Sequence, residues 1–165
     1  CSLSAIPMGG GRRKYEFLWA DWPDEERRNI LALLDRLERY GKVPIVTWSG
    51  RSADFPQLLK AIKRLRIRPS RGVLDARHHV DVLEFMRANV RLPIPKFSLK
   101  DVAEYWGIAR RSRVADGREA NALYAAYRQE RRGKQKRRLQ RKLQRYCYDD
   151  LKCVVEVVGR LGGLA

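Results

Sequence analysis

The sequence predicts an α/β fold with a small, partly parallel sheet. Strand-like and helical segments alternate over the first half of the chain, and the second half carries helical patterns only. Residues 43–48 (VPIVTW) form a short, nearly continuous apolar run, which is typical of a strand covered on both faces. Alternation of this kind favours parallel strands joined by helices. The 165 residues suffice for one core, so we expect residues 1–165 to form a single domain.

Strands and helices of the first half follow from local patterns. The segment 14–20 (KYEFLWA) is rich in aromatic residues and predicts a strand. Residues 24–40 place apolar side chains at helical spacing, and a glycine follows as a stop. After a turn over 49–53, a second helix is expected from about Asp54. Residues 72–76 resemble a further strand.

The second half of the chain predicts only helices. Ser98 is placed to cap one of them, and Asp101 stands three residues later in the capping-box position. Glycines and prolines separate the helical segments. The expected helices cover residues 79–90, 98–106, 116–132 and 134–158.

A strong positive charge predicts a polyanionic partner. Lysine and arginine total 36 against 19 aspartate and glutamate residues, which gives a net charge of +17. Nucleic acid is the commonest partner for such a chain, although basic composition alone also serves solubility. No apolar run is long enough to cross a membrane. No helix combines a basic face with a bulky apolar face, so we expect no membrane partner.

One segment concentrates this charge. The stretch 128–145 holds ten lysines and arginines in 18 residues. Two interpretations stay open, a solvated helical face and a face that follows a phosphate backbone. We expect single-stranded DNA or RNA as the ligand.

The three cysteines indicate reduced thiols in a cytoplasmic protein. They cannot all pair, and no Cys or His spacing matches a zinc site. The first residue is Cys1 rather than methionine. We therefore expect a fragment, a processed product or a shortened chain, with other domains of a larger protein as partners.

Two aspartates stand out by position. Asp54 follows a buried strand and a turn, where α/β folds place active sites, although a helix N-cap role alone would also explain it. Asp150 lies one helical turn after Tyr146 and on the same face, beside an apolar stripe. Asp149 is expected to point outward as a solvated neighbour. The stripe consists of Leu143, Cys147, Leu151, Val154 and Val158.

Carboxylates in this arrangement suit phosphodiester hydrolysis. Two divalent ions about 3.5–4 Å apart activate water and stabilise the leaving oxygen. Oxygen ligands select Mg²⁺ or Mn²⁺ over zinc, and a tyrosine hydroxyl beside one carboxylate orients the attacking water. A carboxylate beside the core needs a metal or another cation to offset its desolvation.

Four segments resemble a known nuclease family. Residues 46–60 (VTWSGRSADFPQLLK) are similar to the second motif of DEDD 3′→5′ exonucleases, and 146–150 (YCYDD) to the third motif, Tyr-x-x-x-Asp. Residues 79–87 (HVDVLEFMR) and 97–110 (FSLKDVAEYWGIAR) resemble the linking segments of the predicted RecB-like and ribonuclease-H-like exonucleases in that superfamily. The resemblance implies a ribonuclease-H-like fold, with a mixed central sheet flanked by helices, and metal-dependent 3′→5′ exonuclease activity.

The resemblance also implies roles for single residues. Asp54 and Asp150 correspond to metal ligands, Tyr146 to the residue that positions water, and Asp81, with His79 beside it, to an auxiliary acid. Ser49 stands where many relatives have asparagine. The expected nucleic-acid contacts are Trp48, Ser49, Arg51, Lys100, Arg110, Arg111, Lys136, Arg137 and Arg141.

The family's first motif, Asp-x-Glu on the first strand, is not found. No acid precedes Lys14, and Asp21 and Asp24 follow a strand that better matches a later one of the family's sheet. We therefore expect the N-terminal strand to be missing or the site to be degenerate. Metal affinity should be weak, and this chain alone should have little or no activity.

Two other functions stay open. The chain would serve as a catalytically inactive, nuclease-like scaffold that binds nucleic acid if the site is degenerate. Alternatively, residues 97–114 resemble a helix-turn-helix with a basic second segment. Trp48 fits a core position or a platform on which a base stacks. His78 and His79 are more typical of a cap or surface pair than of metal ligands.

Overall fold

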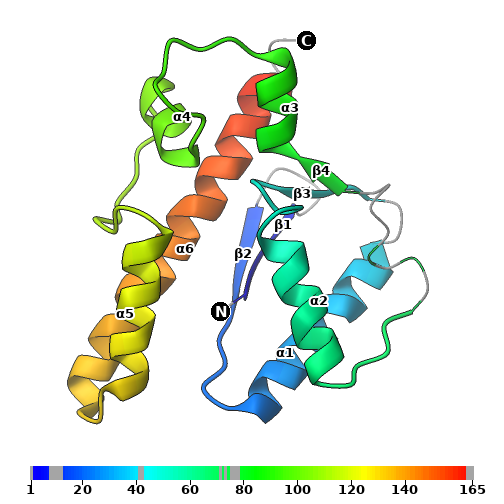
Figure 1. Ribbon diagram of the computed structural model, residues 1–165, viewed down its shortest axis with the longest axis vertical. Coiled ribbons are helices and arrows are strands. Elements are labelled where there is room, and N and C mark those ends of the chain that lie inside the picture. Colours follow the sequence, from blue (N-terminus) through cyan, green and yellow to red (C-terminus); the bar gives the residue numbers. More distant parts are fainter. Residues whose placement is uncertain are drawn as a thin grey trace. The chain divides into compact units, whose positions relative to one another are not determined.

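The computed structural model describes residues 2–7, 13–40, 43–70, 72, 74 and 79–162. The chain divides into two compact units, and each is described by itself. Unit 1 comprises Cys1–Ser2 and Leu18–Asp101, and unit 2 comprises Leu3–Phe17 and Val102–Ala165. The elements are β1 (Ser2–Pro7), β2 (Arg13–Leu18), α1 (Pro23–Tyr40), β3 (Ile45–Thr47), α2 (Asp54–Arg64), β4 (His79–Asp81), α3 (Val82–Asn89), α4 (Leu99–Tyr105), α5 (Gly117–Gln129) and α6 (Gly133–Gly162) (Figure 1).

The described strands form two small sheets. β1 pairs with β2, and β3 pairs with β4. The β3–β4 pair is parallel, with Thr47 opposite Asp81 at the carboxyl ends of the two strands. The predicted α/β class is therefore confirmed, although the parallel pair includes residues 79–81, which were expected to be helical. One mixed central sheet is not seen among the described strands, which lie in two separate pairs.

Helices α1 and α2 build the core of unit 1. Ile30 and Leu34 lie one turn apart on α1 and pack with Ile62 of α2 and with Ile67 just beyond it. All four side chains are buried. This core supports α2, whose first residue is Asp54.

Helix α3 follows β4 without a connecting loop. Asp81 is both the last residue of β4 and the N-cap of α3, and its extended backbone conformation allows this change of direction. Val82, Leu83 and Met86 of α3 are buried. A site at the end of β4 is thus fixed by α3, which follows β4, and by β3, which pairs with it.

In unit 2, α5 and α6 form a helical hairpin (Figure 1). Tyr127 of α5 is buried, as are Leu139 and Leu143 of α6. Further along α6 the buried residues are Asp149, Cys153, Val154 and Val157. The buried stripe of α6 thus overlaps the predicted one at Leu143 and Val154 but not at Val158, which is exposed.

Several predicted boundaries are wrong. β1 was not expected, and residues 79–81 form a strand instead of the first turn of a helix. α5 ends at Gln129, and α6 begins at Gly133 and continues through Gly159. The strand expected over 72–76 falls mainly outside the described residues. The two described residues of this segment, Gly72 and Leu74, are in turns.

The predicted Ser98 cap is confirmed, and the alternative helix-turn-helix is wrong. The Ser98 hydroxyl accepts the backbone N–H of Asp101 at 3.1 Å, as a capping box requires. Residues 108–115 are not helical, so the second helix of a helix-turn-helix does not form there. None of the described helices is both long and apolar enough to span a membrane.

Packing around Ile62 gives a test of the unit 1 core. Ile62→Ala should lower the free energy of unfolding by about 2–5 kcal/mol, because it leaves a cavity between α1 and α2. Leu59→Ala on the same helix is the control, since Leu59 is 51% exposed and should change stability by less than about 0.5 kcal/mol. Urea unfolding of the full chain measures both. Equal losses would contradict this core.

Candidate active site

Asp81 is the buried acid at the centre of the unit 1 site. Only 4% of its surface is exposed. Its carboxylate accepts backbone N–H groups from the loop after β3, Ser49 at 2.9 Å and Arg51 at 3.1 Å. It also accepts those of Leu83 at 3.1 Å and Glu84 at 3.5 Å in the first turn of α3. Four donors leave this carboxylate little capacity to bind a metal.

The loop after β3 is shaped by these bonds. Ser49 adopts a φ of 60°, which is uncommon for a residue with a side chain. Gly50 is required next, because a Cβ there would overlap the side chain of Thr47. The Gly50 carbonyl then accepts the N–H of Phe55 at 2.8 Å. The loop is thereby closed onto the start of α2, which carries Asp54.

Asp54 differs from Asp81 although both stand at helix starts. Ala53 is the N-cap of α2, and Asp54 is the first helical residue. Its carboxylate is exposed and has no hydrogen-bond or ion-pair partner within the described part of the chain. Partial desolvation and the negative charge of Asp81 raise the pKa of Asp54. A capping role therefore does not explain this residue.

Arg51 and His79 are engaged in local contacts. The Arg51 guanidinium pairs with Glu84 at 2.9 Å and donates to the carbonyl of His79 at 3.1 Å. The His79 ring lies 2.6 Å from the Thr47 hydroxyl and stacks on Phe55, with ring centroids 4.3 Å apart. His79 is buried in β4, so the expected cap or surface role is wrong. His78 lies outside the described residues.

The unit 2 site is a pair of adjacent acids on α6. Asp149 is 2% exposed and accepts the backbone N–H groups of Arg111 and Ser112. The expectation of a solvated Asp149 is therefore wrong, because the segment before α5 folds over it. Asp150 is only half-buried, and one of its oxygens lies 2.9 Å from the Arg110 guanidinium. Both acids thus hold the same segment, residues 110–112.

Tyr146 and Asp150 interact as their spacing predicts. The two side chains lie one helical turn apart on α6, and the Asp150 carboxylate acts on the Tyr146 hydroxyl. Burial and the charge of Asp150 raise the pKa of Tyr146, so the phenol keeps its proton at neutral pH. Burial also raises the pKa of Asp150, against the opposing effects of Tyr146 and Arg110. Asp150 therefore has a hydroxyl donor and a cation beside it.

Carboxylate oxygens are suitable ligands for a divalent metal, but too few of them are placed together here. Among the described residues, no group of three or more His, Cys, Asp and Glu side chains is placed to hold an ion. Asp54 belongs to unit 1 and Asp150 to unit 2. Neither unit supplies a complete metal site from its described residues, and the convergence of the two aspartates stays a prediction.

A comparison with protein families identifies the chain. A family model described as RNase H superfamily matches residues 7–161. This chain belongs to the RNase H superfamily. The match spans both units, and it supports the ribonuclease-H-like part of the predicted resemblance. No curated protein and no solved structure matches the chain.

The predicted nucleic-acid contacts of this RNase H superfamily chain lie on several elements. Trp48 and Ser49 are half-buried in the loop after β3, and Lys100 is exposed on α4. Arg111 is exposed, whereas Arg110 is turned toward Asp150. Lys136, Arg137 and Arg141 share α6. The structure brings Ser49 and Arg51 to Asp81, and it brings Arg110 to Asp150.

Sequence reasoning missed the structural partners of the acids. The burial of Asp149 depends on Arg111 and Ser112, which lie 38 and 37 positions away, so no local pattern indicated it. The contact between Arg110 and Asp150 spans 40 positions and carries no local pattern. The stacking of Phe55 on His79 became visible only with the true position of β4.

Neutralising Asp81 and neutralising Asp54 should have different effects on the stability of the fold. Asp81→Asn should destabilise unit 1 by roughly 1–3 kcal/mol, because an amide satisfies buried N–H donors less well than a carboxylate. The raised pKa of Asp54 means that its charged form costs stability at neutral pH. Asp54→Asn should therefore leave stability unchanged or raise it. Urea unfolding at pH 7 measures both, and a destabilised Asp54→Asn variant would show that Asp54 has a structural partner.

His79 should make stability depend on pH. Burial and the nearby Arg51 lower the pKa of His79 below its ordinary value of 6.5. The unfolded chain therefore takes up a proton first as pH falls, and stability decreases from pH 6.5 downward. His79→Gln should remove this slope between pH 7 and 5.5. The thermal midpoint across that range tests it, and an unchanged slope in the variant would exclude His79 as its source.

Proposed function

We propose that this chain carries part of a site for metal-dependent hydrolysis of single-stranded nucleic acid from the 3′ end. Membership of the RNase H superfamily indicates nuclease-type hydrolysis, and the finer activity rests on the resemblance to DEDD exonucleases. The observation that carries the proposal is Asp54. Its carboxylate is exposed and unpartnered in the described part of the chain, at a strand-to-helix loop where α/β enzymes bind substrates.

Asp150 and Tyr146 supply the second half of the proposed site. Mg²⁺ or Mn²⁺ held by Asp54 and Asp150 would supply an activated water and offset charge on the phosphate. Tyr146 stays protonated, because burial and Asp150 raise its pKa. Its hydroxyl therefore does not act as a general base, and we assign it the orientation of the attacking water.

Asp81 takes the role of a positioning residue in this proposal. Its four backbone hydrogen bonds fix the loop that leads to Asp54. Its charge also raises the pKa of Asp54. Asp81 therefore acts on the site in two ways: it orders the loop, and its negative charge acts on Asp54. The proposed metal ligands are then the carboxylates of Asp54 and Asp150. Two ligands support weak metal binding and little or no turnover by this chain alone.

A nucleic-acid-binding scaffold without activity is the second candidate. One observation favours it: Arg110 already neutralises Asp150 at 2.9 Å. A buried acid that has an arginine partner needs no metal. The two candidates share the basic surface and differ in whether a divalent ion binds at Asp54 and Asp150.

We further propose a cytoplasmic location, on the state of the thiols. Burial raises the pKa of Cys147 and of Cys153 to about 11, so both thiols are protonated and unreactive at neutral pH. Such thiols are typical of reducing compartments.

Mn²⁺ binding separates the two candidates. Asp54→Asn and Asp150→Asn should each weaken Mn²⁺ binding to the chain by about tenfold or more, because each removes an oxygen ligand. Asp35→Asn is the matched control, since Asp35 pairs with Arg39 on the exposed face of α1. Electron paramagnetic resonance of free Mn²⁺ in the presence of a single-stranded oligonucleotide gives the affinities.

Activity is measured in the same samples with a 5′-labelled strand. The chain alone should shorten the strand little or not at all. Any shortening from the 3′ end should be lost in Asp150→Asn and slowed about 10²–10⁴-fold in Tyr146→Phe, and this pattern would support the exonuclease. Mn²⁺ binding that neither aspartate variant alters would contradict it and leave the scaffold.

A further inference from the structure

The first half of α6 is a strongly basic surface. Between Gly133 and Arg145 the helix carries seven lysines and arginines and no acid. Within the described part of the chain, none of the seven forms an ion pair. Their mutual repulsion is therefore not offset by neighbouring carboxylates, which is the condition of a surface that binds a polyanion.

The nearby acids of unit 2 are used elsewhere. Glu119 accepts the backbone N–H of Ala115 at 2.6 Å, ahead of its own helix α5. Glu130 accepts the N–H of Arg132 at 2.8 Å in the connection between α5 and α6. Both acids thus complete helix ends and do not neutralise α6.

Four of the cations form a row along one face of α6. Lys134, Arg138, Arg141 and Arg145 follow one another at spacings of four, three and four residues, which keeps them on one side of a helix. All four are exposed, whereas Leu139 and Leu143 on the opposite side are buried. At 1.5 Å per residue, the row is about 16 Å long. We call it the α6 ridge.

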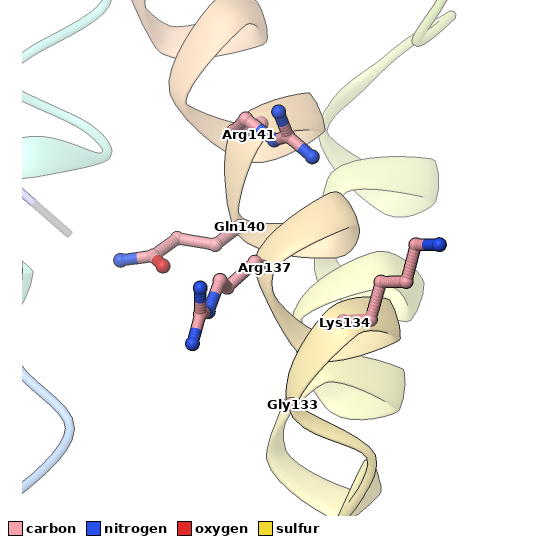
Figure 2. Close-up of a pocket in the computed structure, with 5 residues that line it drawn as sticks. All are labelled: Gly133, Lys134, Arg137, Gln140 and Arg141. Carbon is pink, nitrogen blue, oxygen red and sulfur yellow. The ribbon is translucent and has the colours of Figure 1, made fainter.

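The flanks of the α6 ridge are polar. A hollow of about 510 Å³ beside it is lined by Gly133, Lys134, Arg137, Gln140 and Arg141. Figure 2 shows Lys134 and Arg141 leaving the helix on one side and Arg137 and Gln140 on the other. No large apolar side chain is exposed on this part of α6, so insertion into a lipid surface has no support.

Lys136 has a separate role in this region. It is half-buried, and its ammonium group lies 4.9 Å from the ring centroid of Tyr127, which is itself buried. This cation–π contact joins α6 to α5. The α6 ridge is therefore defined without Lys136.

We propose that the α6 ridge binds the phosphate backbone of nucleic acid independently of the proposed catalytic residues. Three of its four cations are arginines, whose planar forks match phosphate oxygens. Asp150 belongs to the buried side of α6, half a helical turn away from the ridge. The α6 ridge thus retains single-stranded nucleic acid without contacting the scissile bond. This inference rests only on the part of the proposed function that concerns nucleic-acid binding.

Salt-dependent binding tests the α6 ridge. The ridge variant is Arg138→Gln/Arg141→Gln/Arg145→Gln, which keeps good helix formers at three exposed positions. The matched control is Lys60→Gln/Lys63→Gln/Arg68→Gln, which removes the same charge from exposed positions of unit 1. Fluorescence anisotropy of a labelled single strand is measured in EDTA between about 50 and 200 mM salt, so that no metal or turnover is needed.

The ridge variant should bind at least tenfold more weakly at low salt. Its log–log salt slope should fall by about 2, since each phosphate contact on a single strand contributes about 0.7. The control should change affinity by less than threefold. Equal effects of the two variants would show that only net charge matters and would overturn the ridge, as would no effect of either.

Two further measurements test the ligand and the fold. Because binding is measured in EDTA, without metal or turnover, a failed exonuclease would leave the ridge standing. Anionic vesicles or polyglutamate that bind the ridge as tightly as the strand does would overturn the assignment to nucleic acid. Arg141→Gln alone should reduce the slope by about 0.7. That variant keeps the test decisive if circular dichroism shows that the triple variant has lost helix.

Discussion

The buried carboxylate of Asp81 holds the unit 1 site together. It accepts N–H groups from the loop after β3 and from the first turn of α3, segments separated by about thirty positions. The parallel pairing of β3 with β4 brings those segments to one edge. The positive φ of Ser49 and the closure of the loop onto α2 follow from this anchor, and they place Asp54 where solvent reaches it. Without Asp81, the backbone N–H groups of all four donors would need new partners.

The acids divide into those that serve the fold and those that remain for chemistry. Asp81 and Asp149 are nearly fully buried and each accepts backbone N–H groups. Asp54 is exposed, and Asp150 is half-buried with Arg110 and Tyr146 beside it. In both units an acid that orders backbone thus lies close to one with oxygens still accessible. The pKa of Asp54 and that of Asp150 are both raised. The fold tolerates these two acids because Asp81 and Asp149 stabilise the segments beside them.

The sequence was sufficient for local features and insufficient for long-range ones. The α/β class, the Ser98 cap and the placement of Tyr146 one turn before Asp150 on α6 depend on spacing along the chain, and they were predicted correctly. The burial of Asp149 and the pairing of Arg110 with Asp150 depend on a segment 40 positions away folding onto α6. The two separate strand pairs were missed for the same reason, because periodicity predicts strands but not their partners.

The central claim is that Asp54 and Asp150 bind one divalent centre. A crystal structure of the full chain grown with Mn²⁺ and a short single strand tests it most directly, through the anomalous scattering of manganese. The account predicts a manganese peak that contacts both carboxylates, with Arg110 moved away from Asp150. Carboxylates more than about 10 Å apart could not share ions that lie within roughly 4 Å of each other. Such a separation, with Arg110 still paired to Asp150 and no manganese at either acid, would contradict the account.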